Sequence, residues 1–413
     1  MELIKIGKPY IYENKKNGRI RLCADIIDED EKTLYYEVES KFREFLVVEN
    51  SDAFVLGLLH HAMNEGKNIF CETGVTGQLL FQLRNYYIPI ISHNMPDLHS
   101  INIQADTLPE INNKKNGVVT GNSGGVDSFY TILKYQNELI NDFKLTHLIF
   151  NNISTEDSLD SRIRTVFEKD ILEKNAIAKE LGLIQVNLYS NLYAFYKSHF
   201  IFNYYYAAQY CSAVYALGKL FSVFYFSAGD TLSQFSIDHN KIDDGSDFDL
   251  FSLECFSINN FKVYSAGIEA NRHEKMQFIE NNPCAQRHLQ VCAQEQYEGF
   301  YKYESVELQK LNCGVCRKCR RTIAMLYCDG ILDKYKEIFD LSEFQENKAK
   351  YIGYELATDH KSYTRVIERK LLENNSLPRY TKIWKELWKL RFRITKLKIV
   401  KIIIRTLKNN DIV

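Results

Sequence analysis

Residues 117–133 constrain the fold of this chain more than any other segment. The apolar run 117–121 has the character of a buried strand, a Ser/Gly-rich turn follows at 123–128, and a helical pattern begins at the end of that turn. Backbone N–H groups and the positive end of a helix dipole converge where a strand runs into a helix in this way. The junction therefore predicts an anion-binding turn in an α/β fold. A tight connection without a ligand is the alternative interpretation.

The side chains of this turn refine the prediction. Gly124 and Gly125 let the backbone approach a phosphate closely, and Ser123 and Ser128 add hydroxyl donors. Asp127 should repel a phosphate, unless a divalent cation such as Mg²⁺ bridges its carboxylate to the phosphate oxygens. The turn is therefore expected to bind phosphate groups together with Mg²⁺. It is not a Walker loop, which would need Gly-x-x-x-x-Gly-Lys-Ser/Thr.

Strand and helix patterns alternate after residue 117, which favours βαβ units and an α/β class with a doubly wound parallel sheet. The expected elements, in chain order, lie at 117–121, 127–137, 146–152, 158–181, 184–188, 204–220 and 221–227. Ligands of such folds bind at the carboxyl ends of the strands. We therefore expect the ligand over the carboxyl end of the strand 117–121.

Two further features lie near expected strand ends. Asp230 follows the strand 221–227, where α/β folds place active-site carboxylates, although a turn or helix-capping Asp is equally consistent with the pattern. Asp230 is retained as a candidate cofactor-binding residue. The Phe/Tyr-rich stretch 200–206 is interpreted as a helix core that faces the sheet, with a base-stacking surface as the alternative.

Three domains are expected. Residues 1–112 predict an N-terminal α+β domain, because short alternating segments are followed by two helical patterns. His60 and His61 lie on the first of these helices and are expected at its surface or boundary rather than in a metal site. A polar stretch then marks the start of the second domain at 113–330, and residues 331–413 form a helical, basic extension.

The second strong signal is a cluster of three cysteines at x-x spacing. Thiolates at this spacing can turn toward one ion, and a fourth ligand upstream completes a tetrahedral site. We expect structural Zn²⁺, with an iron–sulfur cluster as the alternative and redox-active cysteines as a minor option. The expected ligands are Cys292, Cys313, Cys316 and Cys319. Cys284 is the alternative to Cys292, and Cys328 is less suitable because it lies far along the following helix.

The turn Ser123-Gly124-Gly125-Val126-Asp127-Ser128 resembles the pyrophosphate loop (PP-loop) of the N-type ATP pyrophosphatases. The resemblance implies a PP-loop fold similar to the adenine nucleotide alpha hydrolases (HUP-like), with ATP and Mg²⁺ at the loop. It also implies an ATP-dependent, AMP-forming ligase or synthase. Such an enzyme adenylylates a carboxylate or amide oxygen, and a nitrogen nucleophile then displaces the adenylate. Asp127 and Ser128 would take part in catalysis.

The cysteine set, one upstream Cys followed by Cys-x-x-Cys-x-x-Cys, resembles the 7-cyano-7-deazaguanine synthase branch of this family. In that branch a helix that opens with a Lys precedes the set. The resemblance implies that Lys275 contacts the ATP phosphates as a catalytic residue, with Arg272 as a neighbouring candidate; a solvated basic turn is the alternative. The similarity covers residues 117–328. The added terminal domains and the longer gap between Cys292 and Cys313 leave the acceptor, a small molecule or a protein, unspecified.

Two other functions are consistent with the same loop. A PP-loop enzyme can thiolate tRNA or a nucleobase, but that chemistry would need a reactive cysteine pair outside the metal site. The remaining cysteines show no such pairing; they are Cys23, Cys71, Cys211 and Cys255. The other alternative is a non-catalytic nucleotide-binding subunit of a defence or biosynthetic complex. The intact Ser123, Asp127 and Ser128 argue against loss of activity.

The net charge and the sequence patterns at the two ends of the chain limit the expected cellular location and partners. The net charge of −1 excludes a bulk attraction for nucleic acid. A signal peptide and a transmembrane run are both missing from the pattern, so a cytoplasmic protein with reduced cysteines is expected. Basic and apolar residues interleave from residue 379 onward. This extension is expected to dock on the chain itself or on an acidic partner protein, with a membrane surface or nucleic acid as weaker alternatives.

Overall fold

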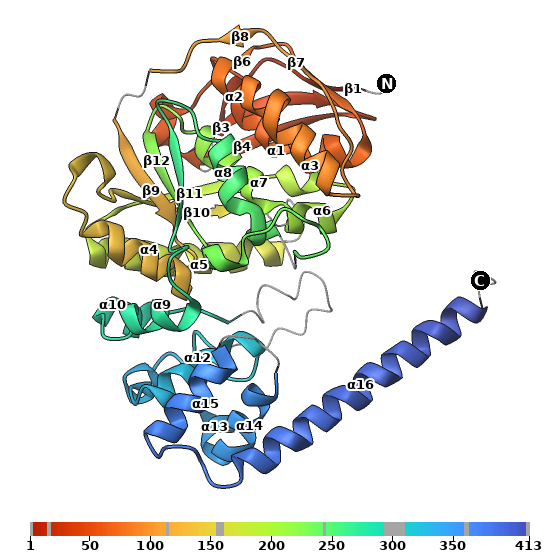
Figure 1. Cartoon of the computed structure of the whole chain (residues 1–413). Helices are drawn as coiled ribbons and strands as arrows, with labels where there is room; N and C mark the ends of the chain where they lie inside the picture. Colours follow the sequence, from red (N-terminus) through yellow and green to blue (C-terminus); the bar gives the residue numbers. More distant parts are fainter. Residues whose placement is uncertain are drawn as a thin grey trace. The chain divides into compact units, whose positions relative to one another are not determined.

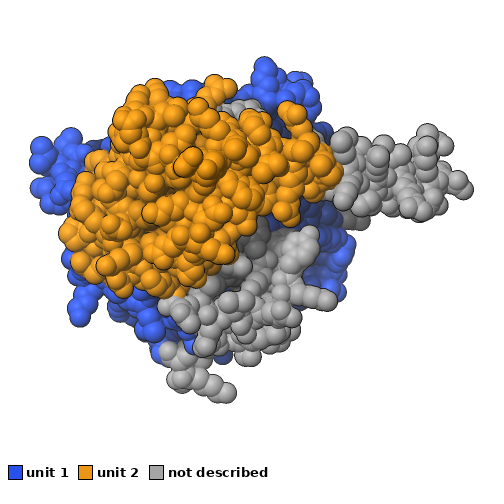
Figure 2. All heavy atoms as spheres, turned by 90° about the horizontal axis from the view of Figure 1, so that it is seen from below, with its two compact units in different colours: residues 1–271 blue, residues 272–413 orange. Residues whose placement is uncertain are grey.

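The computed structural model describes residues 3–14, 18–112, 115–153, 161–242, 245–292, 310–358 and 363–409. The chain forms two compact units, residues 1–271 and residues 272–413, which are coloured separately in Figure 2. We call them unit 1 and unit 2. None of the helices in the described part of the chain combines the length and apolar character that crossing a membrane requires.

Five parallel strands form the part of unit 1 that carries the predicted turn. In chain order they are β9 (Gly117–Gly121), β10 (His147–Asn152), β11 (Ile184–Ser190), β12 (Phe221–Ser227) and β13 (Lys262–Ala266). They lie in the order β13-β12-β9-β10-β11, and every neighbouring pair is parallel. The chain runs outward from β9 to β11 and then returns to the other side of β9. The strand order therefore reverses between β9 and β12.

Helices cover both faces of these strands (Figure 1). On one face, α4 (Val126–Gln136) and α5 (Ser161–Leu181) lie together, and the ring of Tyr135 in α4 stacks on Tyr225 of β12 at 3.7 Å. The alternate residues of the strands, such as Val119 and Phe224, belong to a core shared with α1 (Asp52–Glu65), α7 (Tyr206–Tyr215) and α8 (Asp249–Cys255). The α/β class with a mostly parallel central sheet is confirmed, whereas the finer PP-loop fold stays a prediction.

The N-terminal strands continue the same sheet, which has 11 strands within the described residues. These strands are β1 (Leu3–Ile6), β2 (Tyr10–Asn14), β3 (Arg19–Ile27), β4 (Glu31–Glu39), β5 (Asn68–Cys71) and β7 (Ile103–Gln104). β4 pairs antiparallel with β11, so that Tyr36 lies opposite Ser190. Two short strands, β6 (Val75–Thr76) and β8 (Thr107–Leu108), form a separate sheet. The expected boundary near residue 112 therefore does not separate compact units, because backbone hydrogen bonds join the two parts.

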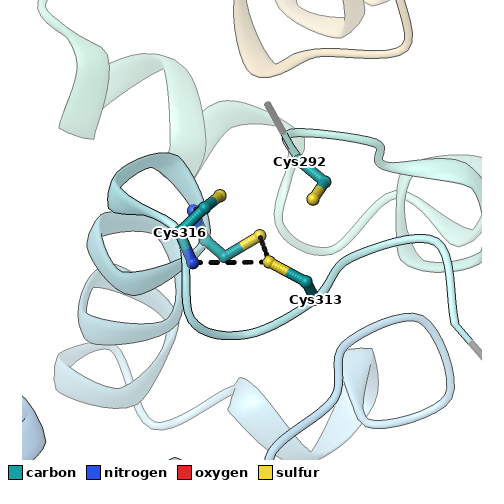
Figure 3. A group of neighbouring side chains, drawn as sticks. Cys292, Cys313 and Cys316 are labelled. Atoms are coloured by element: carbon teal, nitrogen blue, oxygen red, sulfur yellow. Dashed lines mark hydrogen bonds between the residues drawn. The ribbon is translucent and has the colours of Figure 1, made fainter. Parts of the chain in front are cut away.

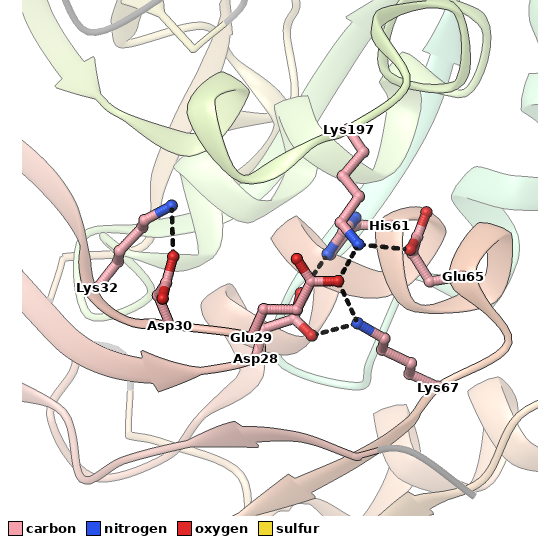
Figure 4. A network of polar contacts seen from close by, with 8 residues as sticks. All are labelled: Asp28, Glu29, Asp30, Lys32, His61, Glu65, Lys67 and Lys197. Carbon is pink, nitrogen blue, oxygen red and sulfur yellow. Dashed lines mark hydrogen bonds and ion pairs between the residues drawn. The ribbon is translucent and has the colours of Figure 1, made fainter.

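The two histidines of α1 are buried, contrary to the surface position that we expected. His60 Nε2 lies 2.8 Å from the hydroxyl of Tyr87. His61 Nε2 lies 3.0 Å from a carboxylate oxygen of Asp28, which also accepts a hydrogen bond from Lys67 (Figure 4). Burial acts to raise the pKa of Asp28, but these two partners lower it overall. The surface prediction was wrong because α1 packs against α7 and the sheet and so is buried around nearly its whole circumference.

Unit 2 is helical in its described residues. Its helices are α9 (Arg272–Ile279), α10 (Pro283–His288), α12 (Arg317–Cys328), α13 (Ser342–Glu346), α14 (Lys348–Ala357), α15 (Tyr363–Glu373) and α16 (Thr381–Asn409). Both α14 and α15 pack against α12. The expected boundary at residue 330 therefore falls inside a compact unit, because the cysteine-rich segment and the C-terminal helices share one core.

Candidate functional site

The predicted anion-binding turn lies at the carboxyl end of β9. The strand ends at Gly121, and α4 begins directly after Gly125, which is extended at the N-cap. Gly124 has a φ of 77°, in the left-handed region that favours glycine. Gly125 N donates to Ser123 Oγ at 3.2 Å, and the hydroxyl of Ser128 donates to the carbonyl of Gly121. The turn thus presents the start of a helix toward the end of the sheet, a geometry suited to anions.

A cavity of about 400 Å³ opens beside this turn. It is lined by Ser123 and Ser128 of the turn, by Phe226 and Ser227 at the end of β12, and by Tyr206 and Tyr210 of α7, among others. Its walls are therefore mainly aromatic, with hydroxyl groups at the end formed by the turn. The cavity lies where the strand order reverses, which is where open α/β sheets bind ligands. Its volume is typical of a small-molecule site.

The aromatic stretch 200–206 belongs to the core and to the cavity at once. Phe202 is buried, as the core interpretation predicts, but it also lines the cavity together with Asn203 and Tyr206. The ring of Tyr206 stacks on Phe226 with centroids 5.9 Å apart. The sequence alone favours only the core role, because helical periodicity does not show which part of an apolar face borders an opening.

Two polar residues that sequence reasoning missed hold the turn in place. Asn122 is buried directly before the turn, and its Nδ2 donates to Gln185 Oε1 at 2.8 Å. Glu269 follows β13 and accepts hydrogen bonds from Tyr130 at 2.7 Å and from Lys134, both on α4. Burial acts to raise the pKa of Glu269, but the bonds from Lys134 and Tyr130 lower it to about 2. No local sequence signal identifies these residues, because their partners are distant in the chain.

Asp230 lies beyond β12, as predicted, but its carboxylate is engaged within its own loop. It accepts hydrogen bonds from Gln234 Nε2 at 2.8 Å and from the hydroxyl of Ser246. These contacts are those of a turn residue, which was the alternative interpretation. A contact between Asp230 and a nucleotide stays a prediction.

Arg272 and Lys275 both lie on α9, and Lys275 is buried. They belong to unit 2, whereas the turn 123–128 belongs to unit 1. Their expected contact with ATP phosphates therefore stays a prediction.

The four predicted metal ligands lie together in unit 2, and Figure 3 labels three of them. The group consists of Cys292, Cys313, Cys316 and Cys319, whose sulfur atoms all lie within 4.8 Å of one another. In a tetrahedral site with Zn–S bonds of about 2.3 Å, the sulfur atoms are about 3.8 Å apart. The observed separation of 3.9 Å between Cys313 Sγ and Cys319 Sγ matches that geometry. The group can hold a metal ion such as Zn²⁺, and it includes neither Cys284 nor Cys328.

Asn312 connects the two segments that carry these cysteines. Its Oδ1 accepts hydrogen bonds from the backbone N–H groups of Val291 at 2.8 Å and Cys292 at 3.1 Å. Its Nδ2 donates to the carbonyls of Leu289 at 2.7 Å and Ile338 at 3.1 Å. The side chain is fully buried. Asn312 therefore positions Cys292 beside the Cys-x-x-Cys-x-x-Cys segment, and sequence reasoning did not identify it.

The turn between Cys313 and Cys316 has little steric freedom. Gly314 has a φ of 70°, and a Cβ built there would lie 1.8 Å from the backbone oxygen of Asp340. Cys313 Sγ accepts a hydrogen bond from the N–H of Cys316 at 3.3 Å, and Cys316 Sγ accepts one from the N–H of Cys319 at 3.5 Å. Such N–H donors favour thiolates, the form that binds metal.

Hydrogen bonding among the thiols shifts their acidities in opposite directions. The bond with Cys292 lowers the pKa of Cys313 to about 7, whereas bonding to neighbouring thiols raises the pKa of Cys292 and Cys319. Several thiolates held this close together repel one another, so a cation is needed to stabilise all of them at once. The donor set is therefore that of a soft or borderline metal ion.

No protein-family model, curated protein or solved structure matches this chain. The resemblance to the N-type ATP pyrophosphatases rests on the turn 123–128 and the cysteine set, and membership in that family stays a prediction.

Proposed function

We propose that this chain is an ATP-dependent, AMP-forming ligase or synthase with a PP-loop fold, which adenylylates a carboxylate or amide acceptor for attack by a nitrogen nucleophile. The position of the turn 123–128 carries the proposal. The turn opens α4 where the strand order reverses, and its two serines line the cavity of about 400 Å³. A helix start at such a reversal favours a phosphate, and the aromatic walls favour a planar group beside it.

The residues of the turn have separate tasks in this proposal. The backbone around Gly124 and Gly125 and the hydroxyl of Ser123 hold the phosphates that leave as pyrophosphate. Ser128 closes the turn onto Gly121, so its hydroxyl has to rotate before it can donate to a phosphate. Asp230 stays a weaker candidate for nucleotide binding, since its carboxylate is already engaged in its loop.

Asp127 is the residue that would hold Mg²⁺. It lies in the first turn of α4 and is partly exposed. One carboxylate fits this ion, because Mg²⁺ in nucleotide sites takes its other ligands from phosphates and water. When bound, Mg²⁺ neutralises charge that develops on the leaving pyrophosphate. The roles of Lys275 and Arg272 at the phosphates rest on the resemblance alone.

The proposed reaction has two steps. An acceptor oxygen attacks the α-phosphorus of ATP, the bond to the bridging oxygen breaks, and pyrophosphate leaves with the electron pair. The nitrogen nucleophile then attacks the activated carbon, AMP leaves, and the nitrogen loses a proton. The aromatic walls formed by Tyr206, Tyr210 and Phe226 limit the access of water, which would otherwise hydrolyse the adenylate.

The test is to incubate the purified protein with ATP, Mg²⁺, ammonia and candidate acceptors that include deazapurine carboxylates, and to quantify AMP and pyrophosphate. Asp127→Asn is expected to reduce AMP formation about 100-fold. The matched control Asp142→Asn changes an exposed Asp outside the turn and should have no effect. Formation of ADP and phosphate would contradict the proposed bond cleavage. Full AMP formation by Asp127→Asn would contradict the assigned role of Asp127.

The thiols outside the cluster support a nitrogen rather than a sulfur nucleophile. Burial raises the pKa of Cys23, Cys71 and Cys255 to about 12, and it raises that of Cys211 well above its usual range. The thiolate is the reactive form of cysteine, so these residues are poorly suited to sulfur transfer. The AMP assay also separates the enzyme from the non-catalytic subunit, which would bind ATP without cleaving it.

A structural Zn²⁺ at the four cysteines belongs to the same proposal. Sulfur atoms within 4.8 Å of one another suit a single ion. An iron–sulfur cluster would need more widely spaced thiolates, because its cysteines bind different iron atoms. Four cysteine ligands fill a tetrahedral site, which is the pattern of structural rather than catalytic zinc. Metal analysis of the purified protein should find one zinc per chain, and iron in its place would contradict this assignment.

A further inference from the structure

Helix α16 carries an apolar stripe that unit 2 leaves uncovered. Four large side chains on this stripe are about half exposed: Ile383 58%, Leu387 50%, Leu390 55% and Ile394 46%. They follow one another at intervals of four, three and four residues. This alternation is the heptad pattern of a helix that packs lengthwise against another helix. We call these four residues the seam.

A different face of α16 holds the helix to unit 2. A Cβ on Gly353 of α14 would lie only 2.6 Å from Trp384 Cβ, which shows how closely the two helices approach. The rings of Trp388 and Phe392 meet Tyr354 of α14 edge to face at 5.0 and 5.5 Å. Figure 1 shows α16 as one long helix that continues beyond this contact. The contacts that hold α16 to α14 therefore do not involve the seam residues.

The charge beside the seam is positive on balance. Arg391 and Arg393 are exposed and occupy two of the heptad positions that flank the seam, and Glu386 occupies a third. Lys389 Nζ donates to the Glu386 carboxylate at 2.8 Å, and Glu386 is the only acidic residue among the many Lys and Arg residues between 379 and 409. A helix that covered the seam would place its own flanking residues against these cations. An acidic helix gains from that placement, whereas a basic one is repelled.

We propose that the seam is the docking surface for an acidic amphipathic helix of a partner protein. Its span from Ile383 to Ile394 corresponds to about 17 Å of helix, or three turns. The proposal is independent of the proposed ATP chemistry, because none of these residues belongs to the turn or to the metal site.

Two other occupants fit the seam less well. In a parallel pair with a second copy of α16, Glu386 would face Arg391 of the other helix, but the excess of Lys and Arg over this one acidic residue on both helices opposes pairing. A membrane surface favours a wider apolar face with aromatic residues at its edges. Here the stripe is narrow, and Trp384 and Trp388, the only two tryptophans of the chain, lie on the face that packs on α14.

The test uses the full chain and two synthetic helical peptides with the same apolar heptad residues. One peptide carries Glu at the flanking positions and the other carries Lys. Titration calorimetry should show that the acidic peptide binds at least tenfold more tightly and that added salt weakens its binding. The double variant Leu387→Asp/Leu390→Asp should lose at least tenfold in affinity. The matched control Lys382→Glu, on the outward side of the heptad, should bind as the unaltered chain does.

Circular dichroism verifies that the variants fold. We expect them to fold because the substituted side chains are exposed. Equal binding of both peptides, or unchanged binding by the double variant, would overturn the proposal. A dimeric mass in light scattering that becomes monomeric in the double variant would assign the seam to a second copy instead. Flotation with phosphatidylglycerol vesicles, abolished by the double variant and unaccompanied by peptide binding, would assign it to a membrane surface.

Discussion

Replacing Asn312 tests whether a buried amide organises the cysteine site. In Asn312→Ala the N–H groups of Val291 and Cys292 and the carbonyl of Leu289 lose their partner. The carbonyl of Ile338 loses one bond but still accepts the backbone N–H of residue 312 at 2.9 Å. Because Asn312 has no exposed surface, water cannot replace these bonds without rearrangement.

The expected loss follows from these three groups. Each buried backbone group left without a partner costs about 1 kcal/mol or more, so Asn312→Ala should destabilise unit 2 by about 3 kcal/mol. If this whole free-energy cost is expressed as weaker metal binding, the affinity for Zn²⁺ falls about 100-fold. Asn312→Asp keeps the two acceptor contacts but loses both donor contacts and adds charge beside the thiolates. It should retain more stability than Asn312→Ala at low pH, where the carboxyl is protonated.

The assay is competition for Zn²⁺ with a coloured chelator, combined with thermal unfolding. Asn281→Ala is the matched control, since Asn281 is exposed and its side chain accepts one hydrogen bond within the described part of the chain, from Lys334 at 2.8 Å. The control should lie within about 0.5 kcal/mol of the unaltered chain. If Asn312→Ala binds zinc as tightly as this control does, the reasoning that Asn312 positions Cys292 is wrong.

Three further predictions concern the loop, a buried acid and the metal ligands. Gly124→Ala should weaken ATP binding about fivefold by calorimetry, because the φ of 77° costs a Cβ-bearing residue about 1 kcal/mol, while Gly182→Ala, at a φ of 67° outside the turn, should bind ATP normally. Burial raises the pKa of Glu355 from 4.5 to about 7, so the folded state binds this proton more tightly; the stability that it contributes is fully present below pH 4.5 and is lost as pH rises from 4.5 through 7, by about 3 kcal/mol in all. Glu355→Gln should flatten the pH profile of chemical unfolding, and a variant with the same slope as the unaltered chain would refute this. Cys316→Ser should lose stoichiometric zinc, and full retention would remove Cys316 from the ligand set.

Local patterns predicted the strand, turn and helix around residues 117–136 almost residue by residue. β9 begins and ends where expected, and α4 starts one residue early. The cysteine spacing likewise predicted which sulfur atoms would meet. The strand–turn–helix pattern succeeds because it depends on contacts between residues that are close in sequence. The cysteine spacing succeeds because thiolate ligands bind a metal ion in few geometries. The same reasoning did not find Asn312, since its partners come from distant segments.

Long-range pairing determined what local patterns did not show. β4 and β11 are about 150 residues apart, and their hydrogen bonds merge the expected N-terminal domain with the parallel strands. The cavity beside the turn exists only because α6 (His199–Tyr204), α7 and the end of β12 meet there. The sequence of α16 contains basic and apolar residues along its whole length. Packing on α14 decides which apolar face remains exposed.

By itself, the amino-acid sequence determined the α/β class, the Ser/Gly-rich turn between strand and helix at 123–128 and the four-cysteine set, because backbone preference and ligand spacing act over a few residues. Only the tertiary structure decided the extent of the sheet, the aromatic cavity beside the turn and the exposed seam of α16. Those features depend on which surfaces meet when distant segments bury their apolar side chains. The spacing of residues within one segment does not determine which surfaces these are.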